Sequence, residues 1–228
     1  RLLEQGKWED VSDILRPWPS DEQGWAVRVR GELLARSADQ LGATQLEAVV
    51  EELVERAARN PLPHMQAWAM QWQGRLAFRR YDFRQAAGLY RRSADRADST
   101  LERARSLRLA AEASREAGDW LKAFEFARTA RTHAEEVRHL VEAASALLVE
   151  RTIVARAGWP EPARPELVGI VALVGRPSLT GRVASVESWI AFRKGDLEMA
   201  GLLVEQARQW ALRGGILDAV LHCDALRV

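Results

Sequence analysis

Cysteine and lysine are scarce in this sequence. Its 228 residues contain one cysteine, Cys223, and only three lysines beside 30 arginines. A single cysteine excludes an internal disulfide framework and a metal site built from several thiolates. It also favours a reducing compartment, so we expect a cytoplasmic protein. The arginine-rich, lysine-poor composition is typical of GC-rich bacterial genomes.

A long apolar run and an excess of charge are also missing. The apolar run at 167–175 is far too short to cross a bilayer, so we expect no membrane span. The chain starts at Arg1 without an initiator methionine or a secretory leader, and we expect it to be a piece of a longer protein. Its 33 basic and 32 acidic residues give a net charge of +1, which provides no general attraction to nucleic acid or anionic membrane.

The sequence also lacks the usual signatures of catalysis and of cofactor or metal binding. The string at 175–181 has no Gly-Lys-Ser/Thr ending of a phosphate loop. No two of the four histidines are separated by the one helical turn that zinc hydrolases use. His222 directly precedes Cys223, and adjacent helical side chains diverge, so this histidine is not aimed at the thiol. We therefore predict no catalytic site, no cofactor and no metal in a protein that is not an enzyme.

What the sequence does contain is helical periodicity. Its eight prolines fall in connections between apolar-periodic segments, where a residue without an amide hydrogen is tolerated. Small and apolar residues recur between them at three- and four-residue steps, as at 101–117. Leu202, Leu203 and Trp210 follow a similar spacing near the end of the chain. No segment alternates long enough for a strand, so we predict an all-α fold.

Short turns recur along the chain at nearly constant intervals. The last four begin 37, 40 and 37 residues apart, and the gap before Tyr81 leaves room for another turn near 38–41. A fixed period of this size is the signature of a helical repeat protein. The recognisable turns are at 6–9, 81–84, 118–121, 158–160 and 195–198.

Small residues follow the turns at fixed offsets. They allow the second helix of a hairpin to pack closely on the first, and a Gly-Asp pair supplies a left-handed helix end followed by an N-cap. The first set of these residues is Val11, Ala86, Ala123, Ala163 and Ala200, and the second set, seven positions further on, is Ser93, Ala130 and Ala207.

The unit at 68–94 resembles a tetratricopeptide repeat. Gly74, Phe78, Ala86 and Tyr90 stand at the small, aromatic, alanine and aromatic positions of the family pattern. The units at 104–131 and 181–210 are similar with some departures. The unit around 158–178 departs most, because prolines replace its tight turn, and there we expect a shortened second helix at about 166–174. The likeness extends over residues 1–228, which we interpret as a single α-solenoid.

The resemblance implies a right-handed superhelical solenoid of about five to six antiparallel helix hairpins. The long period is also similar to the repeat arrays of large bacterial regulators, such as LuxR-type activators related to the maltose regulator and multidomain signalling ATPases. By this likeness the chain would be a scaffold that binds a protein or peptide. It would form the sensor or regulatory region of a larger bacterial signalling or transcription-regulatory protein.

In this family, set positions of the first helix of each hairpin face a concave groove. Arginines mixed with aromatic residues there would suit an acidic peptide, because guanidinium groups bind carboxylates and aromatic faces accept apolar side chains. The residues that the repeat assigns to this groove are Trp68, Gln71, Arg75, Phe78, Arg79, Arg105, Arg108, Arg115, Trp189 and Arg193.

Several alternatives remain open at this point. Trp25, Trp68 and Trp189 are either ligand anchors or side chains partly buried against the next helix. The arginines are either a binding surface or ordinary solvated residues. Two functions compete with peptide binding: a small-molecule sensor with its inducer in the concave cavity, and a nucleic-acid-binding repeat, against which the near-zero net charge argues. The sequence is also compatible with an oligomer.

Overall fold

The computed structural model describes residues 7–16, 25–59, 62–159 and 177–213. The chain divides into two compact units, unit 1 (Arg1–Ala113) and unit 2 (Ser114–Val228). Every regular element in these four ranges is a helix, ten in all, and no strand occurs within them. The all-α prediction is thereby confirmed.

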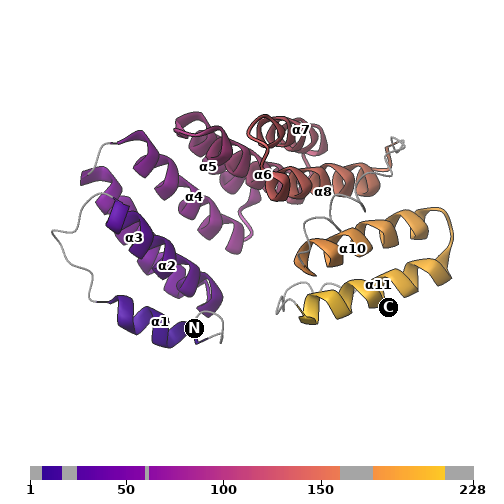
Figure 1. Cartoon of the computed structure of the whole chain (residues 1–228), viewed down its shortest axis with the longest axis horizontal. Coiled ribbons are helices and arrows are strands. Elements are labelled where there is room, and N and C mark those ends of the chain that lie inside the picture. Colours follow the sequence, from indigo (N-terminus) through magenta and orange to yellow (C-terminus); the bar gives the residue numbers. More distant parts are fainter. Residues whose placement is uncertain (1–6, 17–24, 60–61, 160–176, 214–228) are drawn as a thin grey trace. The chain divides into compact units, whose positions relative to one another are not determined.

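Unit 1 consists of helices that contact the next helix along the chain. Neighbouring pairs from α1 to α5 pack together, and in Figure 1 α4 and then α5 follow the overlapping ribbons of α2 and α3. The boundary between the units falls within the last turn of α6. The helices are α1 (Trp8–Leu15), α2 (Trp25–Leu41), α3 (Ala43–Arg59), α4 (Pro63–Arg79), α5 (Phe83–Arg96) and α6 (Thr100–Glu116).

Unit 2 contains α7 (Trp120–Glu136), α8 (Leu140–Ala157), α10 (Pro177–Arg193) and α11 (Leu197–Arg213). α7 packs on α8, α8 on α10, and α10 on α11. The short helix predicted at 166–174, and Ala163 before it, lie outside the described residues. Among the helices described in both units, none is long and apolar enough to cross a membrane.

Left-handed glycines end helices at two of the predicted turns. Gly118 and Gly195 both have a φ of 81°, and the N–H of the aspartate that follows donates to a carbonyl five residues back. Asp119 and Asp196 then cap the next helix, Asp196 by accepting from the N–H of Met199 at 3.0 Å. This is the Gly-Asp turn that the sequence predicts, a left-handed helix end followed by an N-cap.

Two further turns have the same hydrogen bonds around a residue that is not glycine. Tyr81 has a φ of 61° between α4 and α5, and Arg138 has a φ of 54° between α7 and α8. At the first of them the N–H of Asp82 donates to the carbonyl of Ala77 at 2.9 Å. Aromatic residues seldom adopt this conformation, so Tyr81 strains the backbone of its turn.

The small residues at fixed offsets from the turns are buried, as predicted, wherever the structure describes them. The first set includes Ala86 and Ala123, both inaccessible to solvent, and the second includes Ala130. Gly74 shows why such positions stay small. A Cβ atom there would lie 2.8 Å from the ring of Tyr90, so α4 and α5 approach this closely only because Gly74 has no side chain.

Separate apolar clusters hold the helices of each unit together. In unit 1, Leu34, Leu53 and Met65 bring α2, α3 and α4 onto one cluster. In unit 2, Leu148 of α8 packs with Ile190 of α10 in another cluster. These helices therefore bury apolar side chains against their neighbours in the same unit.

One expected turn lies slightly later than the sequence placed it. The turn expected near 38–41 is made by Gly42, with a φ of 133°, because α2 continues to Leu41. In α11 the buried face consists of small residues, and Leu202 is 61% exposed. The reason is that α11 approaches α10 closely beside Gly181, where only small side chains fit.

Candidate functional site

One face of α4 carries several of the predicted groove residues. Trp68, Trp72, Arg75 and Arg79 are spaced four, three and four residues apart, which places them on one side of the helix. All four form hydrogen bonds with acidic side chains of α2. This face of α4 is therefore turned toward α2.

Asp39 of α2 binds both arginines. Its carboxylate accepts from Arg75 Nη2 at 2.8 Å and Nε at 3.0 Å, and from Arg79 Nε at 2.8 Å. Arg79 Nη2 also donates to the main-chain oxygen of Asp39 at 3.0 Å. The Asp39 side chain is buried, whereas both arginine side chains remain partly exposed. The geometry is that of a carboxylate held between two guanidinium groups.

The two arginines keep Asp39 ionised in spite of its burial. Burial opposes the charged form, but hydrogen bonds from Arg75 and Arg79 outweigh it and lower the pKa of the Asp39 carboxyl. The pKa of Arg75 is raised, because its contact with Asp39 outweighs its own burial. The Asp39 carboxylate and the guanidinium groups of Arg75 and Arg79 therefore form a charged network that stabilises the fold at neutral pH.

Glu32 of α2 holds both tryptophans. Trp68 Nε1 and Trp72 Nε1 donate to the same oxygen, Glu32 Oε2, at 2.9 and 3.1 Å. Arg36 Nε donates to the other oxygen at 2.8 Å. Glu32 thus supplies the acceptor that a buried indole N–H requires. We call Glu32, Asp39, Trp68, Trp72, Arg75 and Arg79 the α2–α4 seam.

A second set of polar groups joins α4 to α5 and α6. Gln71 Nε2 donates to Ser106 Oγ of α6 at 2.6 Å. Ser93 Oγ of α5 donates to the main-chain oxygen of Ala67 at 2.7 Å and lies 3.1 Å from Ser106 Oγ. These bonds fix the three helices at one point, next to the α2–α4 seam.

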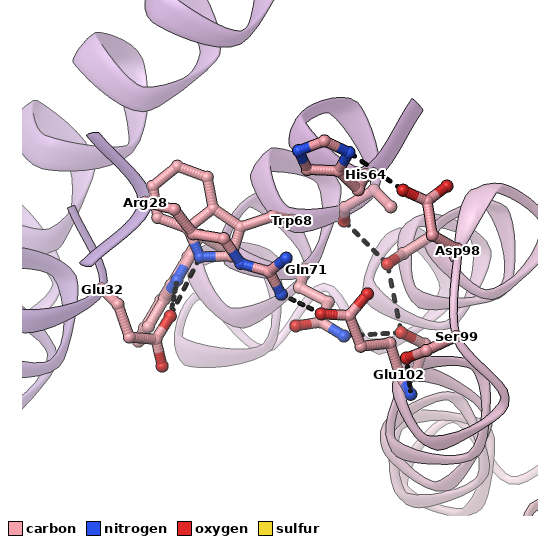
Figure 2. Close-up of polar contacts among 12 residues, drawn as sticks. Arg28, Glu32, His64, Trp68, Gln71, Asp98, Ser99 and Glu102 are labelled. Carbon is pink, nitrogen blue, oxygen red and sulfur yellow. Dashed lines mark hydrogen bonds and ion pairs between the residues drawn. The ribbon is translucent and has the colours of Figure 1, made fainter. Parts of the chain in front are cut away.

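An ion pair between Arg28 of α2 and Glu102 of α6 lies beside these residues, as Figure 2 shows. Its two members, with Trp68 and Gln71 among others, line a cavity of about 10 Å³. That volume is sufficient for about one water molecule. Side chains from α2 and α6 thus meet across α4 at the place where the sequence predicts an open groove.

The structure corrects the expected accessibility of Trp68. Its side chain is only 3% exposed and belongs to the core cluster of unit 1, so the burial alternative holds for this residue. Gln71, Arg75 and Arg79 are likewise engaged by other residues of the chain. The physical reason is that α2 and α6 present their own polar side chains to this part of α4.

Sequence reasoning missed Glu32 and Asp39, although a signal for them was present. Each lies 36 and 40 residues before its two partners on α4. That separation is close to the repeat period, so an acidic residue one repeat before an arginine or tryptophan was a candidate partner. Glu102, 74 residues after Arg28, is separated from it by about two periods.

The other predicted groove residues of unit 1 lie in different surroundings. Phe78 packs edge-to-face on Phe83, with ring centroids 5.1 Å apart. Arg108 Nη1 donates to Glu112 Oε1 at 3.1 Å, one turn further along α6. Arg105 is exposed. Among the groove residues predicted in this unit, Arg105 is thus the most accessible cation.

The predicted groove residues of unit 2 are also engaged within their unit. Arg115 Nη2 donates to Glu116 Oε1 at 2.6 Å. Trp189 is partly buried, and the guanidinium carbon of Arg156 lies 6.0 Å from its ring centroid. Arg193 Nη1 donates to the main-chain oxygen of Ala155 at 3.0 Å.

The other candidate residues add no site. His64 contacts Asp98 at 2.9 Å, and His139 caps α8 by accepting from the N–H of Glu142. No cluster of three or more His, Cys, Asp or Glu suited to a metal ion occurs in the part of the chain that the structure describes. His222 and Cys223, and the side chain of Trp25, lie outside that part.

Known proteins provide no further assignment of these residues. No protein family, no curated protein and no solved structure matches this chain. The functional argument therefore rests on the chemistry of its own side chains.

Proposed function

We propose that the chain is a helical-repeat scaffold of the tetratricopeptide type, a right-handed superhelix of antiparallel hairpins that binds a protein or peptide. It would act in the bacterial cytoplasm as the sensor or regulatory region of a larger signalling or transcription-regulatory protein. One observation supports this proposal most strongly. In both units, side chains form hydrogen bonds with residues that lie about one repeat away in the sequence.

These contacts have similar sequence separations in both units. In unit 1 they join residues 35, 36 and 40 positions apart. In unit 2, Arg151 donates to Glu187, 36 positions away, and Arg193 bonds to a carbonyl 38 positions away. Repeats linked in this way build a surface from equivalent positions of successive helices, which supports a binding role for that surface.

The chemistry of the α2–α4 seam supports an acidic ligand. Asp39 is held between Arg75 and Arg79 in the way that a ligand carboxylate would be held by arginines elsewhere on the first helices. Arg105 is exposed on α6, and Phe78 is partly exposed on α4 of the same unit. Arginines and aromatics together suit an acidic peptide that also carries an apolar residue.

Binding of fluorescent peptides to the purified chain tests this proposal. Peptides with several glutamates and one phenylalanine should bind, and Arg105→Gln should weaken binding by about 3- to 10-fold. Arg128→Gln, which removes an exposed arginine from the second-helix segment α7, is the matched control and should leave the affinity unchanged.

Two results would overturn the proposal. Equal affinity of the wild type and Arg105→Gln would remove the first-helix face as the binding surface. A rise of several degrees in the melting temperature with a sugar or nucleotide, without any peptide binding, would instead favour a small-molecule sensor.

A further inference from the structure

The outer side of α5 carries a concentration of positive charge. This helix contains four arginines and one aspartate, whereas α3, α7 and α11 each contain at least as many acidic as basic residues. All four arginines are exposed. We call Arg84, Arg91, Arg92 and Arg96, together with Gly88, the α5 face.

The arginines of the α5 face are not neutralised by neighbouring carboxylates. Within the described ranges, none of the four takes part in an ion pair or a hydrogen bond through its side chain. On α3, by contrast, Arg56 and Arg59 each pair with a glutamate one turn earlier. The charge of the α5 face is therefore available to a partner.

Gly88 leaves the middle of this face open. It is exposed in the centre of α5, and a Cβ atom added there would meet nothing within 4 Å. Packing inside the chain therefore does not require a glycine, although glycine weakens a helix relative to alanine. The missing side chain lets an external segment approach the helix backbone between Arg84 and Arg91.

Tyr81 adds an exposed aromatic ring at the N-terminal end of the same helix. Its side chain is 80% exposed and packs edge-to-face on Phe83, with ring centroids 6.0 Å apart. The equivalent turns before α7 and α11 have Gly118 and Gly195 at this left-handed position, and the turn before α8 has Arg138. Tyr81 thus places an exposed aromatic ring beside the arginines of α5, where it can contact a partner.

We infer that the α5 face and Tyr81 together bind an acidic helix of another protein. Arg84 and Arg91 are two helical turns apart, and Arg92 and Arg96 are one turn apart, so carboxylates at three-, four- and seven-residue spacings on a partner helix match them. An apolar side chain at one end of that helix packs on Tyr81. This surface lies on a second helix and does not depend on the first-helix surface of the proposed function.

A protein partner fits this surface better than nucleic acid. Asp82 and Asp95 interrupt the basic face, and both are exposed. The preceding second helix, α3, carries four glutamates against two arginines. A phosphate backbone carries a negative charge at every step and cannot avoid these carboxylates, whereas an acidic helix can place its carboxylates opposite the arginines and uncharged residues opposite Asp82 and Asp95.

The test uses the full chain and a defined probe. The probe is a fluorescein-labelled peptide of about 16 residues, long enough to span α5, with glutamate at every third or fourth position and phenylalanine at one end. Its glutamine analogue, and single- and double-stranded DNA of similar length, are the comparison ligands. The glutamine analogue should bind at least about 10-fold more weakly, because it lacks the carboxylates.

Two variants test the surface. Arg84→Gln/Arg91→Gln/Arg92→Gln should weaken binding by at least about 10-fold, while Arg128→Gln/Arg138→Gln/Lys194→Gln, with the same change in charge on unit 2, should stay within about 2-fold of the wild type. Tyr81→Gly should weaken binding about 5-fold and yet raise the melting temperature by about 2–4 °C, because it relieves the strained turn. A purely structural role for Tyr81 would not move affinity and stability in opposite directions.

Two outcomes would overturn the inference. One is wild-type affinity in the triple variant of α5, and the other is DNA binding that is tighter than peptide binding at the same salt concentration. The Arg105→Gln variant separates the two proposals. Loss of peptide binding in Arg105→Gln but not in the α5 variant would support the first-helix surface and reject the α5 face.

Discussion

The arginines of α4 and those of α5 show that one residue type serves two purposes within unit 1. Arg75 and Arg79 bind the buried Asp39 of a neighbouring helix. Arg84 and Arg91, only a short distance further along the chain, are exposed and have no ion pair with any described residue. The amino-acid composition does not distinguish the arginines of α4 from those of α5. What distinguishes them is whether a carboxylate of an adjacent helix faces them.

The largest expected effect comes from Trp68 on the α4 side of this comparison. Trp68→Ala should lower the free energy of unfolding by about 3–5 kcal/mol, because it opens a cavity in the core of unit 1 and removes a hydrogen bond to Glu32. Urea denaturation measures the change. Tyr81→Ala, which removes an exposed ring, is the control and should cost less than about 1 kcal/mol. Equal losses in the two variants would contradict the buried position of Trp68.

Asp39→Asn should destabilise the fold by about 2 kcal/mol. The variant keeps the size of the side chain but loses the charge-assisted bonds to Arg75 and Arg79. The partial exposure of both arginines limits the loss, since water replaces part of the interaction. Thermal unfolding with Asp39→Glu as a charge-preserving comparison measures it. A melting temperature unchanged by Asp39→Asn would show that this ion pair is not formed in solution.

Two glycines give a direct contrast between the buried and the exposed side of the hairpin. Gly74→Ala should cost about 1–3 kcal/mol, because the new methyl group collides with the ring of Tyr90. Gly88→Ala should stabilise the helix by about 0.5–1 kcal/mol, because its surroundings are open. Chemical denaturation of both variants tests the pair. Changes of the same sign would mean that α4 and α5 do not pack as described.

Acid should weaken the α2–α4 seam in a defined pH range. The pKa of Asp39 is lowered below its usual value of 3.8, so its ionised form stabilises the fold fully above that value. This stability is lost as the pH falls through the lowered pKa, that is, below about pH 4. Unfolding curves recorded at a series of pH values should therefore show a steeper acid loss in the wild type than in Asp39→Asn. If the wild type and Asp39→Asn lose stability in parallel as the pH falls, Asp39 does not contribute to the acid sensitivity of the fold.

The smallest expected effect belongs to the α5 face. Arg91→Gln/Arg92→Gln should change the free energy of unfolding by less than about 0.5 kcal/mol, because both side chains are exposed and bonded to no described residue. Circular dichroism and urea denaturation suffice to measure this. A large loss of stability would mean that these arginines serve the fold, and the contrast with α4 would disappear.

Most of the helical framework could be predicted from local sequence. Gly118 and Gly195 with the aspartates that follow them mark turns whose caps form as expected, because cap chemistry depends only on neighbouring residues. Local sequence patterns were less informative where either of two faces of a helix could pack against the neighbouring helix. Leu202 belongs to an apolar-looking stripe, yet α11 uses its small residues against α10.

The surroundings of the predicted groove could not be read from one helix at a time. Trp68 occupies a first-helix position that the family resemblance assigns to the groove, and only its neighbours decide whether it is exposed. Glu32 provides an acceptor for its N–H and Leu34 belongs to the same cluster, so the indole is buried. Such partners lie about one repeat away in sequence, and finding them requires the register between helices.

Glu32 links the surroundings of two of the nine tryptophans. Trp68 and Trp72 donate to one oxygen of the same carboxylate, so both indole N–H groups lie beside the same negative charge. An excited indole is sensitive to a negative charge at its N–H. Any event that separates α4 from α2 should therefore shift the emission of both rings together, without an added dye, and Glu32→Gln would show which part of the spectrum belongs to this pair.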